Sequence, residues 1–316
     1  MNRTLRSLLG VLLLAVPLSG ASSAQDPWPS RPVRVVVPSS PGGGTDVFAR
    51  LIANAVGESL RQQFVVDNRP GASGNIGAEI VAHAAPDGYT MLISASPAVI
   101  INPSLFRNLS YSAERDLTPV SAGVVSPMAF CVHPGGTIRS IADLVAAAKK
   151  DPGSVSYGSA GVGSSTNLGV RMLEERAGVK FLHIPFKGAA PATQAVLSGQ
   201  IQLVLGDIPS VINQLRAGKL LAIAVTNRLG TLPNIPTMAE SGFPNFDVAA
   251  TFSVMAPAGT PSAIVHRMNT EIVGAMKTPA LAEKLEAQSL IPVYDTPEQF
   301  GERLKTLRAM WAAFVK

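Results

Sequence analysis

The sequence predicts an α/β protein of two domains that are joined by two crossing strands. Three observations predict this fold class. Short β-branched runs alternate with amphipathic helical patterns, the alternation pauses and resumes in mid-chain, and an extended apolar stretch lies on each side of the second block. Such alternation indicates parallel sheets with helices on both faces, and 316 residues are enough for two domains with separate cores.

The first block of alternating patterns begins near the start of the predicted mature chain. The β-branched run 33–37 predicts a buried strand, and a loop rich in proline and glycine follows it. Apolar side chains from Phe48 to Val56 then recur at i, i+3, i+4, i+7 and i+8, which is one face of a helix. The same patterns predict strands at 64–66 and 90–93 and a helix at 76–84.

The second block repeats the alternation after a helix predicted at 141–150. Ser140 is a suitable N-cap for this helix. Gly178 is a suitable end for another helix at 167–177. The remaining expected elements are strands at 155–157, 181–184, 201–205 and 220–225, helices at 190–197 and 209–217, and a mostly helical tail from 262 onward with breaks at Pro279 and Pro297.

Two stretches that are expected to cross between the domains define the domain boundaries. Residues 120–132 and 246–256 are extended, apolar and rich in small side chains. A layout with two crossings returns the C-terminal tail to the first domain. We therefore expect domain 1 to contain residues 25–125 and 253–316, and domain 2 to contain residues 126–252.

Residues 1–24 have the pattern of a secretory signal peptide. Arg3 and Arg6 precede the apolar run 8–14, and small residues occupy positions −3 and −1 of a cleavage site near Ala24. The alternative is a membrane anchor, but a spanning helix needs about 20 apolar residues, and proline and glycine interrupt this segment too early. We expect the segment to be removed and the mature protein to be periplasmic.

The composition argues against several classes of function. The formal net charge of +5 includes the two leader arginines, and no basic run is present, so nothing indicates binding to nucleic acid or to a membrane surface. Aromatic residues are only 5%, which disfavours a site built on stacked rings. The single cysteine, Cys131, cannot form an internal disulfide, so the protein must rely on its core.

A glycine-rich turn between the first strand and the first helix is one candidate binding site. Glycines let the backbone approach a ligand closely, and free amides at a helix N-terminus favour an anion. Gly43→Val should therefore abolish ligand binding and leave the fold intact. Thr45 or Asp46 could equally do no more than cap the helix, and the Walker pattern is absent because no Gly-Lys pair ends the turn. The candidate residues are Pro41, Gly42, Gly43, Gly44, Thr45 and Asp46.

A second glycine-rich turn lies at the corresponding place in the other block, between the strand 155–157 and the helix 167–177. It could be only a flexible turn with a serine or threonine cap. The pairing favours a binding role, because a cleft between two such turns has amide donors on both walls. The candidate residues are Ser159, Ala160, Gly163, Ser164, Ser165 and Thr166.

Three further polar residues follow predicted strands and are added to the candidate site. Asp207 lies at the end of a strand and just before a helix, where it could accept a hydrogen bond from a ligand or cap the helix that Pro209 opens. Ser94 and Ser96 occupy the equivalent position in the first domain. Ligands of open parallel sheets bind at such strand ends.

The sequence contains no pattern that indicates catalysis, a metal or a cofactor. No two histidines lie at metal-ligand spacing, and no Gly-x-Ser-x-Gly elbow occurs. Ser164, Asp207 and a histidine could converge as a triad, but nothing in their spacing requires it. We expect a protein that holds a ligand and is not an enzyme, with a periplasmic serine hydrolase acting through Ser164 or Ser165 as a distant alternative.

Short motifs run in order through nearly all of the predicted mature chain. They occupy residues 28–33, 41–46, 67–72, 74–78, 86–90, 157–161, 187–192, 217–220, 224–226, 236–237, 239–240 and 256–261. With these motifs the chain resembles the Bug-type periplasmic receptors, which are the substrate-binding subunits of tripartite tricarboxylate transporters.

The resemblance implies a fold, a ligand class and a partner. The fold is the type II-like periplasmic-binding-protein or Venus flytrap fold, in which two domains close on a ligand. The ligand is a small carboxylate, such as a di- or tricarboxylate, an amino acid or an aromatic acid, held by backbone amides, hydroxyls and ordered water. The partner is a membrane permease, or alternatively a sensor kinase that reads the liganded receptor.

The chain departs from the usual family pattern at three places. Asn167 stands where a histidine is common, Phe186 where a tyrosine is common, and Thr251-Phe252 where a tryptophan is frequent. Each change removes a titratable group, a hydrogen-bonding group or a large ring. We expect these positions to affect which ligand is bound and not the fold.

Overall fold

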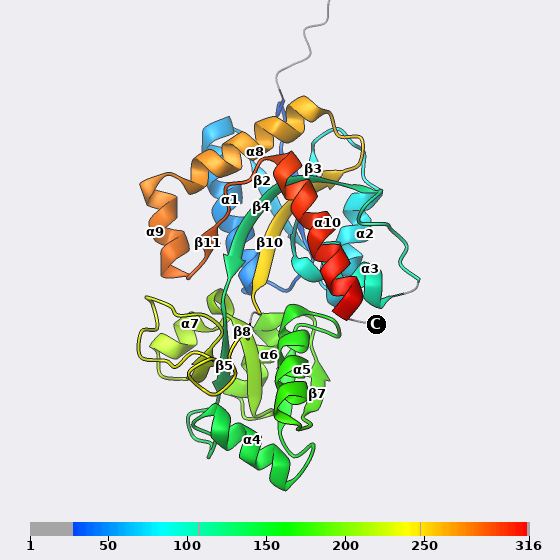
Figure 1. Cartoon of the computed structure of the whole chain (residues 1–316). Helices are drawn as coiled ribbons and strands as arrows, with labels where there is room; N and C mark the ends of the chain where they lie inside the picture. The colour runs from blue at the N-terminus through cyan, green and yellow to red at the C-terminus, as the bar shows by residue number, and fades with distance from the viewer. Residues whose placement is uncertain (1–27, 107, 247, 315–316) are drawn as a thin grey trace, which may run out of the picture.

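The computed structural model describes residues 28–106, 108–246 and 248–314. These residues form two α/β lobes, one above the other in Figure 1. The upper lobe contains a six-stranded sheet of order β11-β4-β10-β3-β1-β2, and the lower lobe a five-stranded sheet of order β7-β6-β8-β5-β9. The strands are β1 Val33–Val37, β2 Phe64–Asn68, β3 Thr90–Ala95, β4 Leu117–Ser126, β5 Met128–Val132, β6 Ser156–Ser159, β7 Leu182–Pro185, β8 Leu203–Asp207, β9 Leu221–Val225, β10 Ala250–Pro257 and β11 Ile291–Pro292.

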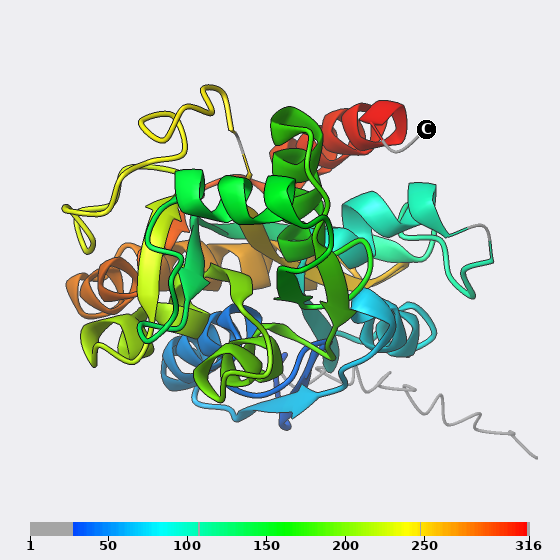
Figure 2. The same ribbon diagram turned by 90° about the horizontal axis from the view of Figure 1, so that it is seen from below.

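Helices cover both sheets. In the first lobe α8 and α10 pack on β4, while α1 and α2 pack on β1; Figure 2 shows the lobes from below, with the second lobe in front. The helices of the first lobe are α1 Gly44–Leu60, η1 Ala72–Gly74, α2 Asn75–Ala82, η2 Pro97–Ile101, α3 Asn102–Leu105, α8 Ser262–Met276, α9 Pro279–Ala287 and α10 Pro297–Phe314. Those of the second lobe are α4 Ile141–Lys150, α5 Ser165–Ala177, α6 Ala189–Leu197 and α7 Ile208–Arg216.

The helix signals of the sequence correspond to observed caps and core contacts. Ser140 Oγ accepts the Asp143 N–H at 3.1 Å and begins α4. Gly178 ends α5 in the left-handed conformation, where a side chain would be strained. Phe48 and Val56 of α1 are fully buried, and burial of side chains of this size contributes about 1.5–3 kcal/mol each to folding.

The chain passes between the lobes twice, which confirms the predicted two-crossing α/β fold class. Pro127 links β4 of the first sheet to β5 of the second, and the chain returns between β9 and β10. At the lobe junction Ala250 of β10 pairs with Ser126 of β4. The domain boundaries at 125/126 and 252/253 remain predictions.

The sheets are mixed, so the expectation of parallel sheets was wrong for the strands next to the crossings. β1 runs parallel to β2 and β3, and β6 runs parallel to β7 and β8. In contrast, β10 is antiparallel to β3 and β4, and β5 is antiparallel to β8 and β9. These antiparallel pairs arise because the chain leaves the first lobe through β4 and β5. It returns to the first lobe through β10, which lies beside β4.

Neither the predicted signal peptide nor a membrane-spanning helix is found among the described residues. The predicted signal peptide, residues 1–24, lies outside the described residues. Over residues 28–106, 108–246 and 248–314, none of the helices combines the length and the apolar character that crossing a bilayer requires.

Candidate ligand-binding site

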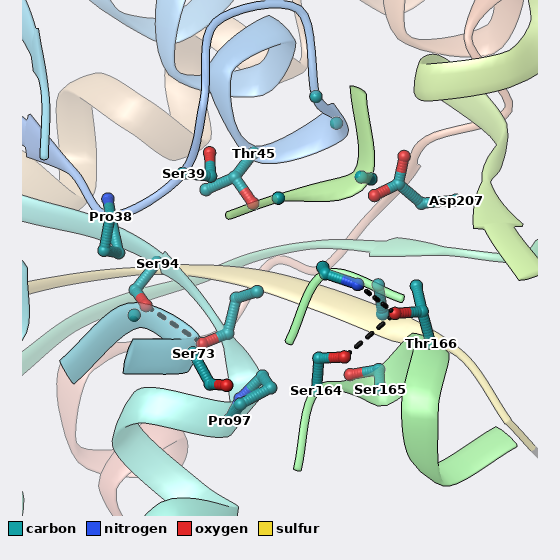
Figure 3. Close-up of a pocket in the computed structure, with 18 of the residues that line it drawn as sticks. Pro38, Ser39, Thr45, Ser73, Ser94, Pro97, Ser164, Ser165, Thr166 and Asp207 are labelled. Atoms are coloured by element: carbon teal, nitrogen blue, oxygen red, sulfur yellow. Dashed lines mark hydrogen bonds between the residues drawn. The ribbon is translucent and has the colours of Figure 1, made fainter. Parts of the chain in front are cut away.

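A pocket of about 70 Å³ lies between the two lobes (Figure 3). One water molecule needs a cavity volume of at least about 10–15 Å³. The pocket therefore has room for several groups of the size of water. The pocket lies where the β1–α1, β3–η2, β6–α5 and β8–α7 connections meet, at the carboxyl ends of parallel strands. Its lining is Pro38, Ser39, Gly43, Gly44, Thr45, Gly71, Ser73, Gly74, Ser94, Ala95, Pro97, Met128, Ala160, Ser164, Ser165, Thr166, Lys187, Gly188, Ala189, Asp207, Ala250 and Phe252.

The first turn, residues 41–46, is held in place from behind by Asp46. The Asp46 carboxylate accepts the Gly42 N–H at 3.0 Å, Arg50 Nε at 2.9 Å and Asn68 Nδ2 at 2.9 Å. Burial opposes the charge of Asp46, but the hydrogen bonds from Arg50, Gly42 and Asn68 outweigh it and hold its pKa below the usual value. The Asp46 side chain therefore fixes the turn and lies outside the pocket lining.

The second turn, residues 158–166, is fixed by neutral side chains. Ser164 is the N-cap of α5, donating to Gly161 O at 2.6 Å and accepting the Asn167 N–H at 3.2 Å. Thr166 Oγ1 accepts the Ala160 N–H at 2.8 Å. Asn167 Oδ1 accepts the Gly163 N–H at 3.0 Å, and Asn167 Nδ2 donates to Tyr157 Oη at 2.8 Å, so the Asn167 side chain fixes the turn.

Asp207 ends β8 and is the N-cap of α7. Its carboxylate accepts the Ser210 N–H at 3.1 Å. The side chain is buried, and this burial raises its pKa, although Ser210 and the backbone amide of Gly44 partly offset the effect. Gly44 belongs to the other lobe, so the carboxylate sits at the junction of the two.

Three hydroxyl groups of the lining have no protein partner among the described residues. Ser39 Oγ is buried without a hydrogen bond, and the hydroxyls of Thr45 and Ser165 form none with residues 28–106, 108–246 and 248–314. A buried hydroxyl normally has a partner, so the Ser39 hydroxyl is unusual, whereas Ser165 is only half-buried. These three groups are therefore available to a polar ligand or to water in the pocket.

Hydrogen bonds and close contacts hold the two lobes together at the rim of the pocket. Ser40 Oγ donates to Lys187 O at 2.6 Å, and Ser73 Oγ donates to Val162 O at 2.5 Å. A Cβ placed on Gly44 would lie 2.7 Å from Asp207 Oδ1. The two lobes are therefore in direct contact at the rim of the pocket.

The structure brings most of the predicted site residues to one pocket. Nine of the candidates line it, namely Gly43, Gly44, Thr45, Ser94, Ala160, Ser164, Ser165, Thr166 and Asp207. The others lie outside the lining, namely Pro41, Gly42, Asp46, Ser96, Ser159 and Gly163.

The candidates outside the lining have contacts of their own that explain their positions. Ser96 Oγ forms a hydrogen bond with Thr251 Oγ1 of β10. Ser159 Oγ lies 2.6 Å from His183 Nε2 and is buried. The Gly42 and Gly163 amides are used inside their own turns.

The side of the pocket formed by η1 was not predicted from the sequence. Gly71 and Gly74 have positive φ angles of 133° and 94° and flank Ser73. These glycines occurred in the motifs 67–72 and 74–78, and their spacing around one serine was the available signal. The other lining residues not predicted as such are Pro38, Ser39, Ala95, Pro97, Met128, Lys187, Gly188, Ala189, Ala250 and Phe252.

The geometry of the serines bears on the hydrolase alternative. In the described part of the chain, neither Ser164 nor Ser165 hydrogen-bonds to a histidine. The histidine that contacts a serine is His183, whose partner Ser159 lies outside the lining. Within the same ranges no group of three or more His, Cys, Asp or Glu side chains could hold a metal ion.

Comparisons with known proteins agree with this architecture. Residues 48–314 match the family model described as the tripartite tricarboxylate transporter family receptor. Protein BugT of Bordetella pertussis is 36% identical over 320 residues, covering 100% of this chain and 98% of BugT.

Two solved structures of similar proteins have the same fold as this chain. Rpa4515 of R. palustris, solved with adipate, is 34% identical with a TM-score of 0.87, over 90% of this chain and 96% of that one. MatC (Rpa3494) of Rhodopseudomonas palustris, solved with malate, is 28% identical with a TM-score of 0.86, over 92% and 100% of the two chains. The chain belongs to the tripartite tricarboxylate transporter receptor family and is a Bug-type solute-binding protein with the two-domain fold of periplasmic binding proteins.

Proposed function

We propose that this receptor binds a small carboxylate in the pocket between its lobes and delivers it to a tripartite tricarboxylate-type membrane permease. The observation that supports it most is the meeting of the α1 and α5 N-termini at one pocket that also contains unpartnered hydroxyls. The bound adipate and malate of Rpa4515 and MatC support the same ligand class.

The carboxylate would be held by dipoles and not by a guanidinium. Among the described residues that line the pocket, Lys187 is the only cationic one, and it is exposed. Free backbone amides follow the N-caps Gly43 and Ser164, and each helix N-terminus stabilises an anion by about 0.3–1 kcal/mol, or up to ~2 kcal/mol when partly buried. Hydrogen bonds from Ser39, Thr45 and Ser165 to a charged carboxylate would add to this.

Closure couples binding to recognition by the transporter. The ligand contacts both lobes, so it stabilises the closed form over the open one. We propose that the permease recognises the closed receptor in the periplasm, after removal of residues 1–24 as a signal peptide. The chain acts as a carrier in this scheme, without chemistry on the ligand.

A thermal-shift screen of the mature protein tests the proposal. The panel contains mono-, di- and tricarboxylates, amino acids and aromatic acids, each with its neutral amide as the matched control. A ligand at 100 times its Kd stabilises the protein by about 2.7 kcal/mol, so the melting temperature should rise by several degrees for some acids and for none of the amides. If every acid leaves the melting temperature unchanged, the proposed function is wrong.

A further inference from the structure

The pocket contains a buried carboxylate, which is unexpected in a receptor for an anion. Asp207 is 6% exposed and belongs to the lining. In the described ranges no Lys, Arg or His side chain forms an ion pair with it. Its hydrogen bond comes from the Ser210 N–H, and the Gly44 amide faces it.

The neighbouring charges do not compensate Asp207. Arg50, on the helix that faces Asp207, is paired with Asp46 at 2.9 Å. Lys187 has an exposed side chain, and its backbone carbonyl is the group that contacts the first lobe. A buried charge without a cation is costly, and burial raises the pKa of Asp207 accordingly.

Capping α7 does not by itself require a charge. Other helices of this protein are capped by neutral hydroxyls, Ser140 on α4, Ser164 on α5 and Thr278 on α9. Asparagine or serine would cap α7 about as well as aspartate. A neutral residue would therefore serve the cap of α7 as well, so the cap does not account for a buried charge at this place.

We propose that Asp207 is the specificity-determining residue that makes the pocket select a carboxylate that also carries a protonated amine. This inference rests on the proposed function. An ammonium group placed at Asp207 forms a charge-assisted hydrogen bond and compensates the buried charge. A second carboxylate at the same place brings two negative charges together and is repelled.

The pocket offers separate places for the carboxylate and for the amine of such a ligand. Figure 3 shows the Asp207 side chain on one side of the pocket, apart from Ser164 and Ser165 at the start of α5. The ligand carboxylate would lie at the α5 N-terminus, where the amides and the Ser165 hydroxyl are free. The amine would lie at Asp207, beside the α1 turn.

The test compares matched acids with and without an amine by calorimetric titration of the mature protein. The pairs are aspartate with succinate, glutamate with glutarate, and 4-aminomethylbenzoate with 4-methylbenzoate. Asp207→Asn keeps the cap and removes the charge. Asp143→Asn, on exposed α4 in the second lobe, is the control for the same change of net charge.

The wild type should bind at least one aminated acid at least about tenfold more tightly than its partner, a difference of about 1.4 kcal/mol. Asp207→Asn should remove this preference by weakening the aminated acid, and Asp143→Asn should keep it. The inference is overturned if no aminated acid binds, if the acid without an amine binds as tightly, or if Asp207→Asn leaves the preference unchanged. Binding of any carboxylate in those cases keeps the proposed function, whereas no binding of any acid overturns both.

Discussion

The two glycine-rich turns face one pocket but are held in position by different chemistry. The first turn depends on the single buried carboxylate of Asp46. It accepts hydrogen bonds from a backbone amide, a guanidinium and a side-chain amide. The second depends on several neutral groups, with Ser164, Thr166 and Asn167 each bonding a backbone group of the turn. Loss of one group should therefore disturb the first turn more than the second.

A further difference concerns the free amides. In the second turn the Ala160 and Gly163 amides are bonded to side chains of the same region, and the amides of Ser165 and Thr166 follow the N-cap Ser164 at the pocket. In the first turn Gly44 faces the carboxylate of Asp207. The first turn therefore meets an anion from the protein itself when the lobes close. This contrast assigns ligand-carboxylate binding mainly to α5 and lobe closure mainly to the α1 turn.

The largest effect is expected for Asp46→Ala. Arg50, Asn68 and the Gly42 N–H lose a charged partner, and one such hydrogen bond contributes about 1.5–3 kcal/mol. Urea unfolding should show a loss of that order, and titration with an acid found in the screen should show much weaker binding. Arg50→Ala is the control, because this exposed partner should contribute less than about 1 kcal/mol. Equal effects of the two changes would contradict the central role of Asp46.

The next effect distinguishes two adjacent glycines. A Cβ at Gly44 would lie 2.7 Å from Asp207 Oδ1 and 2.8 Å from Phe252 Cζ, whereas the nearest atom to a Cβ at Gly43 is Ser40 O at 3.5 Å. Overpacking costs about 1–3 kcal/mol, and here it acts on the closed form. Titration should show affinity reduced at least about tenfold for Gly44→Ala and reduced less for Gly43→Ala. The reverse order would restore the role that the sequence assigned to Gly43.

The second turn should tolerate change better. Ser164→Ala removes the α5 N-cap and should lower the free energy of unfolding by about 1 kcal/mol. Ser165→Ala, whose hydroxyl has no partner in the described chain, should leave stability unchanged and weaken ligand binding. Urea unfolding and titration of both variants check this, and a Ser165→Ala protein with unchanged affinity would exclude that hydroxyl from the site.

The smallest expected effect concerns the pH dependence of the free energy of unfolding. Asp46 and Asp207 should contribute to it with opposite sign. The lowered pKa of Asp46 gives stability that is present above the reference value of 3.8 and is lost as pH falls through the lower folded value. The raised pKa of Asp207 acts in reverse, so stability falls as pH rises from 3.8 through the higher folded value. Unfolding free energies of Asp207→Asn should be flatter than wild type in that upper range, and an unchanged slope would contradict the raised pKa.

The elements and caps of the fold were predictable because they depend on local patterns. The spacing of apolar side chains in α1 and the cap at Ser140 are set within one or two turns of chain. The antiparallel direction of β10 was not predictable in this way, because it follows from where the chain returns between lobes. The two turns were found as candidates since strand ends of parallel sheets converge.

The finer features of the site could not be predicted from the sequence, because they depend on contacts between segments that are far apart in the chain. Gly43 and Gly44 are equivalent in sequence, and only the approach of Asp207 from the other lobe separates them. Ser73 reaches the pocket because η1 packs beside η2, a contact between segments that the sequence does not link. The ligand-binding role of each predicted residue remains a prediction.

The central claim is that backbone amides and hydroxyls of the pocket, and not a cation of the protein, hold the ligand carboxylate. Calorimetric titration of the wild type with an acid from the screen and with the primary amide of the same acid tests it most directly, since the two differ almost only in charge. The acid should bind at least about 100-fold more tightly, or about 2.7 kcal/mol. Equal affinity for acid and amide would contradict the account.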